Sequence, residues 1–299
     1  MGEPAVLCML CGSPRKKILH RGDEDVVLRP EDFSVTKSRI KKGEVSRCLV
    51  CGLVYNTSPR PDPGLYAGVC DPEYESGKAC REKEFVEAFD LAKPFLDDNI
   101  SPLCFLDIGC MTGIFLEHLK AKYPGAMVSG VEPSVWASEI CREKKLDVLC
   151  GRFEDMELGS NRYDAVTLFD VLEHVEDPRR FLKRIHAALK PGGVLLLTTP
   201  NIESLFSRLL GRRYWFIEHM HLYYFGPVTI RKLLQDTGFE PILRKRHFKY
   251  LGSRYFVERL RGLGFLPAKN PEAEIKRPGR ERVFKIYAGQ MLILARKLR

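Results

Sequence analysis

The sequence lacks several features that would place the protein in a membrane or outside the cell. It has no run of about 18 or more apolar residues, so no segment is predicted to cross a bilayer as a helix. Its N-terminus has no basic stretch followed by an apolar core and does not resemble a secretory signal. Val6 stands where N-myristoylation of Gly2 would need Ser or Thr. We therefore expect a cytoplasmic protein, with contact to a membrane surface as a peripheral option.

Internal repeats and low-complexity tracts are also absent, and 44% of the 299 residues are apolar, which is enough for a proper core. The formal net charge of +9 is unevenly distributed, because residues 202–299 alone carry +13. This basic end indicates either a solvated surface or a rim that attracts an anionic acceptor, a membrane surface or a nucleic acid.

Apolar runs alternate with amphipathic stretches from residue 103 onward, which predicts an α/β fold with a largely parallel sheet and helices on both faces. The expected strands are 103–107, 127–131, 147–150, 163–169, 194–199, 239–247 and 288–296. The expected helices are 74–98, 113–122, 133–145, 176–189 and 228–237, with Pro133 in the first helical position of its helix. The basic, aromatic segment 249–283 is expected to be an insertion that caps the sheet.

Four of the ten cysteines form two matched pairs, Cys8 with Cys11 and Cys48 with Cys51, and a glycine follows each pair. Four thiolates at this spacing suit a tetrahedral Zn²⁺ ion, and a site closed by four protein ligands is structural. A redox-active pair would need a surrounding βαβ pattern, which this segment lacks. We predict that residues 1–60 form a zinc-binding module and that residues 61–102 hold a linker and N-terminal helices.

In open α/β sheets, ligands bind beyond the carboxyl ends of the strands. A glycine-bearing turn, 107–113, follows the first strand, and Glu132 ends the second. Glycine permits a tight turn and close backbone approach, and an acid in that place can accept two hydrogen bonds from a ribose diol. These two signals predict a nucleotide-like cofactor, and by themselves they also fit a dinucleotide-binding dehydrogenase.

Five segments in order resemble class I S-adenosylmethionine-dependent methyltransferases. They are FLDIGCMTG at 105–113, VEPS at 131–134, YDAVTLFDVLEHV at 163–175, LKPGGVLLLTTPN at 189–201 and FGPVTIRKLLQDTGF at 225–239. The resemblance implies a Rossmann-like sheet of seven strands over residues 103–299, S-adenosylmethionine as cofactor and methyl transfer as the activity.

The resemblance also implies which residues hold the cofactor. The methionine part falls to Asp107, Gly109, Cys110 and Gly113, the ribose to Glu132 beside Pro133, the adenine to Arg152, Phe153 and Glu154, and the sulfonium to Phe169 and Asp170. The family's turn usually has a middle glycine, where this chain has Met111. That departure keeps open a non-catalytic binding protein that retained the fold.

Two histidines are candidates for the base that a hydroxyl acceptor would need, since imidazole titrates near neutral pH. His174 follows the fourth strand, and His221 lies in a segment expected to fold over the acceptor side together with His219. Asp170, Glu173 and His174 also resemble an acid–acid–His cluster that binds a divalent ion in ubiquinone-biosynthesis O-methyltransferases.

The acceptor is expected to be a small or carrier-linked polar molecule such as a sugar or glycolipid, methylated at a hydroxyl. Cysteine-pair modules ahead of such domains resemble those of bacterial sugar-modifying enzymes. A nucleic acid is the alternative partner, favoured by the cysteine pairs and the basic end. It is disfavoured because Phe169-Asp170-Val171-Leu172 stands where base-amine methyltransferases carry an Asn-Pro-Pro-Tyr-type clamp.

Overall fold

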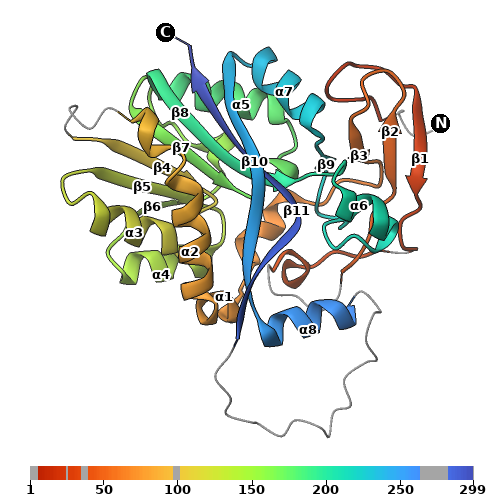
Figure 1. The fold of residues 1–299 in the computed structure, drawn as a ribbon, viewed down its shortest axis with the longest axis horizontal. Helices are drawn as coiled ribbons and strands as arrows, with labels where there is room; N and C mark the ends of the chain where they lie inside the picture. The colour runs from red at the N-terminus through yellow and green to blue at the C-terminus, as the bar shows by residue number, and fades with distance from the viewer. Residues whose placement is uncertain (1–5, 25, 35–39, 97–101, 263–281, 299) are drawn as a thin grey trace, which may run out of the picture.

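Two β-sheets and the helices around them make up the protein in this computed structural model, which describes residues 6–24, 26–34, 40–96, 102–262 and 282–298 (Figure 1). The larger sheet contains β4 (Cys104–Ile108), β5 (Met127–Glu132), β6 (Asp147–Cys150), β7 (Tyr163–Phe169), β8 (Leu189–Pro200), β10 (Phe239–Gly252) and β11 (Val283–Lys297).

The larger sheet has the strand order β10-β11-β8-β7-β4-β5-β6, and only β11 pairs antiparallel with its neighbours. The chain starts this sheet at β4, moves outward to β5 and β6, and then returns to the other side of β4 with β7. The order therefore reverses at β4, which is the place where open α/β sheets bind ligands. The seven-stranded α/β prediction is confirmed.

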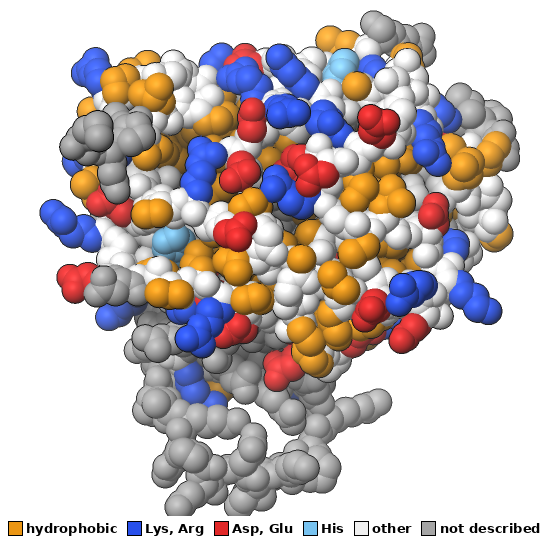
Figure 2. Space-filling view, turned by 180° about the vertical axis from the view of Figure 1, so that it is seen from behind, with side chains coloured by type: hydrophobic (Ala, Val, Ile, Leu, Met, Phe, Trp, Pro, Cys, Tyr) orange, Lys and Arg blue, Asp and Glu red, His pale blue; other side chains and the backbone are white. Residues whose placement is uncertain are grey.

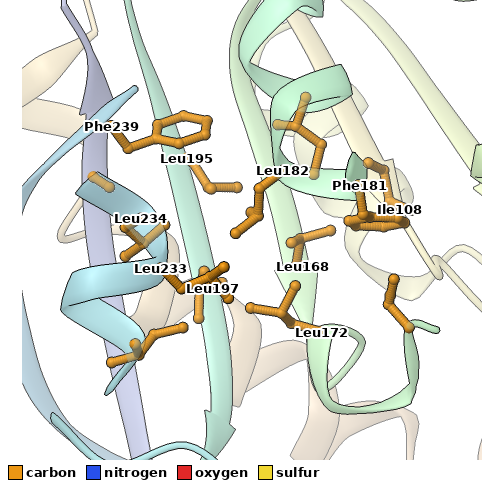
Figure 3. Close-up of a cluster of buried hydrophobic side chains, with 14 of the residues drawn as sticks. Ile108, Leu168, Leu172, Phe181, Leu182, Leu195, Leu197, Leu233, Leu234 and Phe239 are labelled. Atoms are coloured by element: carbon orange, nitrogen blue, oxygen red, sulfur yellow. The ribbon is translucent and has the colours of Figure 1, made fainter. Parts of the chain in front are cut away.

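Helices cover both faces of the larger sheet (Figure 1). One face packs against α5 (Pro178–Ala188) and α7 (Pro227–Asp236), and the other packs against α2 (Lys78–Phe89) and α3 (Ile114–Lys122). Successive strand residues point to opposite faces. Leu195 and Leu197 of β8 accordingly join the α5 and α7 side, while Val194 and Leu196 join the other. Figure 3 shows the first of these cores, with Leu197 of β8 between Leu233 of α7 and Leu168 of β7.

The remaining short elements complete the fold. The helices are α1 (Pro72–Ser76), α4 (Val135–Glu143), α6 (Leu205–Leu210) and α8 (Ser253–Gly262), and the 3₁₀ turns are η1 (Pro30–Phe33), η2 (Pro63–Gly68), η3 (Lys93–Phe95), η4 (Phe153–Asp155), η5 (Leu172–His174) and η6 (Gly211–Arg213). No helix in the described part of the chain is both long and apolar enough to cross a membrane.

The structure corrects several expected boundaries. Pro133 does not begin a helix, because Ser134 is the N-cap of α4 and its Oγ accepts a hydrogen bond from the Ala137 amide at 3.1 Å. The helix expected over 74–98 is divided into α1, α2 and η3. The two last strands are longer than expected, so residues 249–252 belong to β10 and α8 follows them. The rest of the expected insertion, 263–281, lies outside the described residues.

The smaller sheet is built from β1 (Lys16–His20), β2 (Val45–Cys48), β3 (Val54–Asn56) and β9 (Tyr223–Tyr224), in that order. Its fourth strand therefore comes from a segment more than 150 residues further along the chain. Asn56 strengthens this junction, because its Nδ2 donates to the carbonyl oxygen of His219 at 2.8 Å and its amide donates to that of Leu222 at 2.9 Å. The cysteine-bearing segment is thus attached to the segment that carries His221.

Candidate active site

A cavity of about 270 Å³ opens at the carboxyl ends of β4, β5 and β7. It lies at the reversal of strand order, where loops leave neighbouring strands in opposite directions. One part of its wall comes from the turn after β4 and the end of β5, and another comes from the loop after β7 and from residues 216–221. The cavity also receives Phe33 from η1 and Tyr66 from η2.

Two buried acids lie at this edge of the sheet, on the neighbouring strands β4 and β5. Asp107 and Glu132 are each 3% exposed; Asp107 is the next-to-last residue of β4, and Glu132 is the last residue of β5. The Asp107 Oδ1 accepts a hydrogen bond from the Thr167 hydroxyl at 2.6 Å. Burial raises the pKa of Asp107 to about 7, and the nearby charge of Glu132 contributes. Burial likewise raises the pKa of Glu132 to about 7, although two backbone amides oppose the rise.

Glu132 fixes the glycine-bearing turn as well as lining the cavity. Its Oε2 accepts from the Met111 amide and its Oε1 from the Ser134 amide, each at 2.8 Å. Met111 has φ 47°, in the left-handed region that costs a residue with a Cβ roughly 1–2 kcal/mol. The turn therefore does need a positive φ where the family usually has glycine. The hydrogen bond to Glu132 and packing of Met111 against the α2 and α3 core offset that cost.

Asp170 lies in a network of charges on the wall below the turn. Its Oδ2 accepts from the Lys249 Nζ at 2.7 Å, and that same ammonium donates to Glu84 at 2.7 Å. His247 also contacts Glu84, with 2.9 Å between Nε2 and Oε1. Although burial raises the pKa of Asp170, the charges of Lys249 and His247 more than offset it and hold this pKa well below its usual range. Asp170 is therefore an ionised residue fixed by tertiary contacts.

His174 and His221 meet across the cavity, with ring centroids 4.6 Å apart. His174 Nδ1 lies 3.3 Å from the carbonyl oxygen of Met220, and His221 Nδ1 lies 2.7 Å from that of Phe216. A carbonyl oxygen only accepts, so each Nδ1 carries the proton in these two contacts. The two candidates come from distant segments, and the fold brings them together.

Glu173 completes a second cluster with the two histidines. Each of Glu173, His174 and His221 offers a ligand atom, and these atoms lie within 4.8 Å of one another. One carboxylate oxygen and two imidazole nitrogens could hold a divalent cation. The expected acid–acid–His cluster differs in one member, because Asp170 is paired with Lys249 and His221 takes its place. Burial, together with the charge of Asp170, raises the pKa of Glu173 well above its usual value.

Comparison with known proteins identifies the family. The profile described as a methyltransferase domain matches residues 80–244, which is more than half of the chain. The chain belongs to the class I S-adenosylmethionine-dependent methyltransferases. A solved structure from Bacillus halodurans, named as a candidate methyltransferase, is similar in fold, with a TM-score of 0.50 and 19% identity over 73% of this chain and 100% of that one.

Curated relatives of this methyltransferase chain include two ubiquinone biosynthesis O-methyltransferases. The protein from Bradyrhizobium sp. (strain ORS 278) is 34% identical over 151 residues, which cover 46% of this chain and 58% of the relative. The mitochondrial protein from Schizosaccharomyces pombe is 29% identical over 184 residues, which cover 58% of this chain and 62% of the relative. The chain therefore spans only a little more than half the length of these relatives.

The methyltransferase cavity contains nearly all the residues that the sequence proposed for it. Those that line it are Asp107, Gly109, Cys110, Glu132, Pro133, Arg152, Phe153, Glu154, Phe169, Asp170, His174 and His221. Gly113 does not line it, and a Cβ at that position would instead meet Leu146 at 2.3 Å and Cys141 at 3.1 Å. His219 does not line it either; its backbone amide donates to the carbonyl oxygen of Lys41.

Several residues that line the cavity were missed at the level of sequence. Eight of them are Phe33, Ser34, Tyr66, Tyr74, Arg81, Glu84, Met220 and Lys249. Most lie before the family's first motif or after its last one, so no motif indicated them. A signal was present only for Arg81, a cation on the helix that precedes β4. Its guanidinium stacks on the Tyr74 ring, 4.0 Å from the ring centroid.

The four cysteines of the two pairs converge as expected. The Sγ atoms of Cys8 and Cys51 are 3.4 Å apart, those of Cys11 and Cys48 are 3.5 Å apart, and all four lie within 4.8 Å of one another. Zn–S bonds of about 2.3 Å in a tetrahedron place sulfur atoms about 3.8 Å apart, so the cluster fits a zinc ion. Burial raises the pKa of Cys48, but amides of Cys51 and Val50 more than offset this and lower it to about 7.

Proposed function

We propose that the chain transfers a methyl group from S-adenosylmethionine to a hydroxyl group of a small or carrier-linked acceptor. One observation carries the proposal: a single cavity holds the two acids at the ends of β4 and β5 together with the facing pair His174 and His221. The first pair suits an adenosyl cofactor, and the second suits removal of a proton from a hydroxyl. The names of the O-methyltransferase relatives also support an oxygen atom of the acceptor as the atom that is methylated.

The cofactor would lie along the turn after β4. Glu132 would accept hydrogen bonds from the ribose diol, and Asp107 with the backbone of Gly109 and Cys110 would hold the methionine part. Arg152, Phe153 and Glu154 would surround the adenine. Two ion pairs hold the Arg152 side chain in place, because its guanidinium Nη2 lies 3.5 Å from Glu154 and 3.6 Å from Glu176.

Methyl transfer from a sulfonium is an in-line displacement, so the protein must align the hydroxyl, the methyl carbon and the sulfur. Phe169 would lie near the sulfonium, with Asp170 held in place by Lys249. The Nε2 of His174 would accept the hydroxyl proton as the oxygen attacks, and His221 is the second candidate for this role. The bound cofactor would supply the methyl group and become neutral S-adenosylhomocysteine, and the histidine would return its proton to solvent.

A divalent cation is the second candidate for activating the hydroxyl, because Glu173, His174 and His221 offer ligand atoms within one coordination sphere. A cation held there would lower the pKa of a hydroxyl bound to it. Chelation distinguishes the two candidates. Activity that survives treatment with EDTA, with the cysteine-bound metal retained, supports the base, and activity restored only by added Mg²⁺ or Mn²⁺ supports the cation.

The acceptor is proposed to be a small polar molecule, and a ubiquinone-like precursor joins the sugar and the glycolipid as a candidate because of the relatives' names. A nucleic acid is less well supported. On the face shown in Figure 2, acidic and basic side chains are interspersed with apolar ones, and no continuous basic surface runs across it. Binding of nucleic acid draws on such a surface, so this face does not favour it.

The cysteine cluster is proposed to bind a structural Zn²⁺ ion. The sulfur spacing supports this, and so do Gly12 and Gly52, whose φ values of 73° and 78° allow the tight turn after each cysteine pair. The residues 1–60 are proposed as the zinc module and 103–299 as the catalytic domain, joined by the linker 61–102 and by β9.

The decisive experiment incubates the purified protein with methyl-labelled S-adenosylmethionine and fractionated small-molecule extracts, followed by mass spectrometry of labelled products. We expect a labelled O-methyl product that is lost in His174→Ala and retained in the control His118→Ala, a histidine of α3 that does not line the cavity. Calorimetry with S-adenosylhomocysteine is the first check. If the wild-type protein does not bind it, the chain is a non-catalytic relative and the proposal is wrong.

A further inference from the structure

Part of the cavity wall comes from residues that the family domain does not include. Phe33 comes from η1, between the two cysteine pairs, and Tyr66 comes from η2 in the linker, and both precede residue 80. The two rings pack edge to face with centroids 4.7 Å apart. Tyr66 also meets the edge of His174, with centroids 6.1 Å apart, so the added wall reaches the proposed base.

Two polar atoms of the cavity lining, one from this wall and one from η5, are buried without a hydrogen bond. Within the described residues, the Tyr66 hydroxyl and the Glu173 Oε1 have no partner, although both residues line the cavity. Glu173 is 1% exposed, and its other oxygen accepts from the Thr199 hydroxyl at 3.0 Å. A buried polar atom that is left unsatisfied costs stability, so native structures keep few of them without a functional reason.

The surroundings of these two atoms indicate what would satisfy them. The nearby side chains Phe33, Phe216 and Met220 are apolar, and the imidazole rings of His174 and His221 stand on the same side. An apolar ring would fill this space by dispersion contacts and edge-to-face packing. A hydroxyl or similar group on the ring could donate to one of the unsatisfied oxygens and accept from the other.

We propose that Tyr66 and Glu173 form a recognition site for a polar group on a ring-shaped acceptor, separate from the hydroxyl that is methylated. The acceptor class is therefore a ring compound that carries at least one polar substituent besides the reacting hydroxyl. This inference rests on the proposed function and deepens it. It makes Tyr66 a specificity-determining residue, and it gives the segment around the cysteine pairs a part in choosing the acceptor.

The test uses phenol and toluene as probes, because they have nearly the same shape and differ by a hydroxyl in place of a methyl group. Their binding to protein saturated with S-adenosylhomocysteine is measured by ligand-detected NMR titration. We expect Tyr66→Phe to weaken phenol binding about five- to tenfold, the range of a lost hydrogen bond, and to leave toluene binding unchanged. Glu173→Met should also weaken phenol binding. Because both residues contact the same group, the double variant should weaken phenol binding by less than the product of the two single-variant factors.

Tyr55→Phe is the matched control. The Tyr55 hydroxyl is also buried without a partner in the described structure, but Tyr55 belongs to β3 and does not line the cavity. It should change the binding of neither probe. The inference is overturned if phenol does not bind the wild type, if Tyr66→Phe leaves phenol binding unaltered, or if it weakens both probes equally, since equal loss would mean ring packing alone.

Failure of the proposed function would be seen separately, as absence of S-adenosylhomocysteine binding to the wild type. The same two probes would then be titrated onto the protein without cofactor. The comparison of Tyr66→Phe with Tyr55→Phe would still decide for or against the recognition site. Cofactor affinity should be the same in the two tyrosine variants, because no hydrogen bond in the described structure joins either tyrosine to the turn after β4.

Discussion

Replacement of Glu132 by alanine tests the cofactor site most directly. The carboxylate is proposed to accept two hydrogen bonds from the ribose, and it already holds the amides of Met111 and Ser134 at 2.8 Å. Hydrogen bonds to charged groups contribute about 1.5–3 kcal/mol each, but water replaces part of the loss in the variant. We therefore expect a net loss of about 1–3 kcal/mol in binding free energy, a roughly 5- to 150-fold weaker affinity for S-adenosylhomocysteine.

A second effect adds to the first. Without the carboxylate, the Met111 amide loses its acceptor and the left-handed conformation at φ 47° is no longer favoured. A turn that is only partly in its binding-competent conformation lowers the apparent affinity by that fraction. Met111→Gly in the Glu132→Ala background should therefore recover part of the affinity, because glycine adopts a positive φ without strain.

Isothermal titration calorimetry at pH 8 provides the measurement, since burial raises the pKa of Glu132 to about 7 and the carboxylate must be ionised to accept both bonds. Affinity of the wild type should fall as the pH is lowered through 7, and the gap between wild type and Glu132→Ala should narrow. Glu143→Ala, on the exposed surface of α4, is the control and should bind like the wild type. An affinity change below twofold at pH 8 would show that the ribose does not bind at Glu132.

Three further outcomes are expected. Cys48→Ser should release zinc, detected by metal analysis, and lower the thermal midpoint of unfolding while S-adenosylhomocysteine still binds; a wild type free of zinc would contradict this. Lys249→Met should lower the free energy of unfolding by about 3–5 kcal/mol in urea titrations, because Glu84 and Asp170 would remain buried without their cation; a loss below about 1 kcal/mol would contradict it. Burial raises the pKa of Asp107 to about 7, so the folded state binds more protons than the unfolded state between about pH 4 and 7. The wild type should therefore lose stability relative to Asp107→Asn as the pH rises through that window, and parallel pH profiles would refute the assignment.

The glycine-bearing turn shows how far local reasoning reached. A strand followed by a glycine-bearing turn and a helix is encoded by neighbouring residues, and the structure has β4, the turn and α3 in that order. The sequence also marked Met111 as a departure from the family. It could not show that the position keeps a positive φ, because that depends on Glu132, which comes 21 residues later and reaches the Met111 amide only in the folded sheet.

The contacts on the acceptor side of the cavity could be predicted less well from local motifs. His174 and His221 were each proposed from their local motifs, but their contact at 4.6 Å depends on residues 216–221 folding back over the loop after β7. Tyr66 and Phe33 had no motif at all. Asp170 was expected to form a cluster with Glu173 and His174, but its carboxylate is paired with Lys249 of β10 instead. Local reasoning could not show this pairing, because the strand was expected to end before residue 249.

By itself the sequence determined the seven-stranded α/β fold, the family, the two cysteine pairs and the motif residues that line the cofactor side of the cavity. These follow from periodicity and from motifs whose members lie within a few residues of one another. Tertiary structure decided which side chains meet: the His174–His221 pair, the Lys249 network, the Tyr66 wall and the pairing of β9 with β3. Such contacts join residues tens to more than a hundred positions apart, and their free energy depends on the packing of the whole chain.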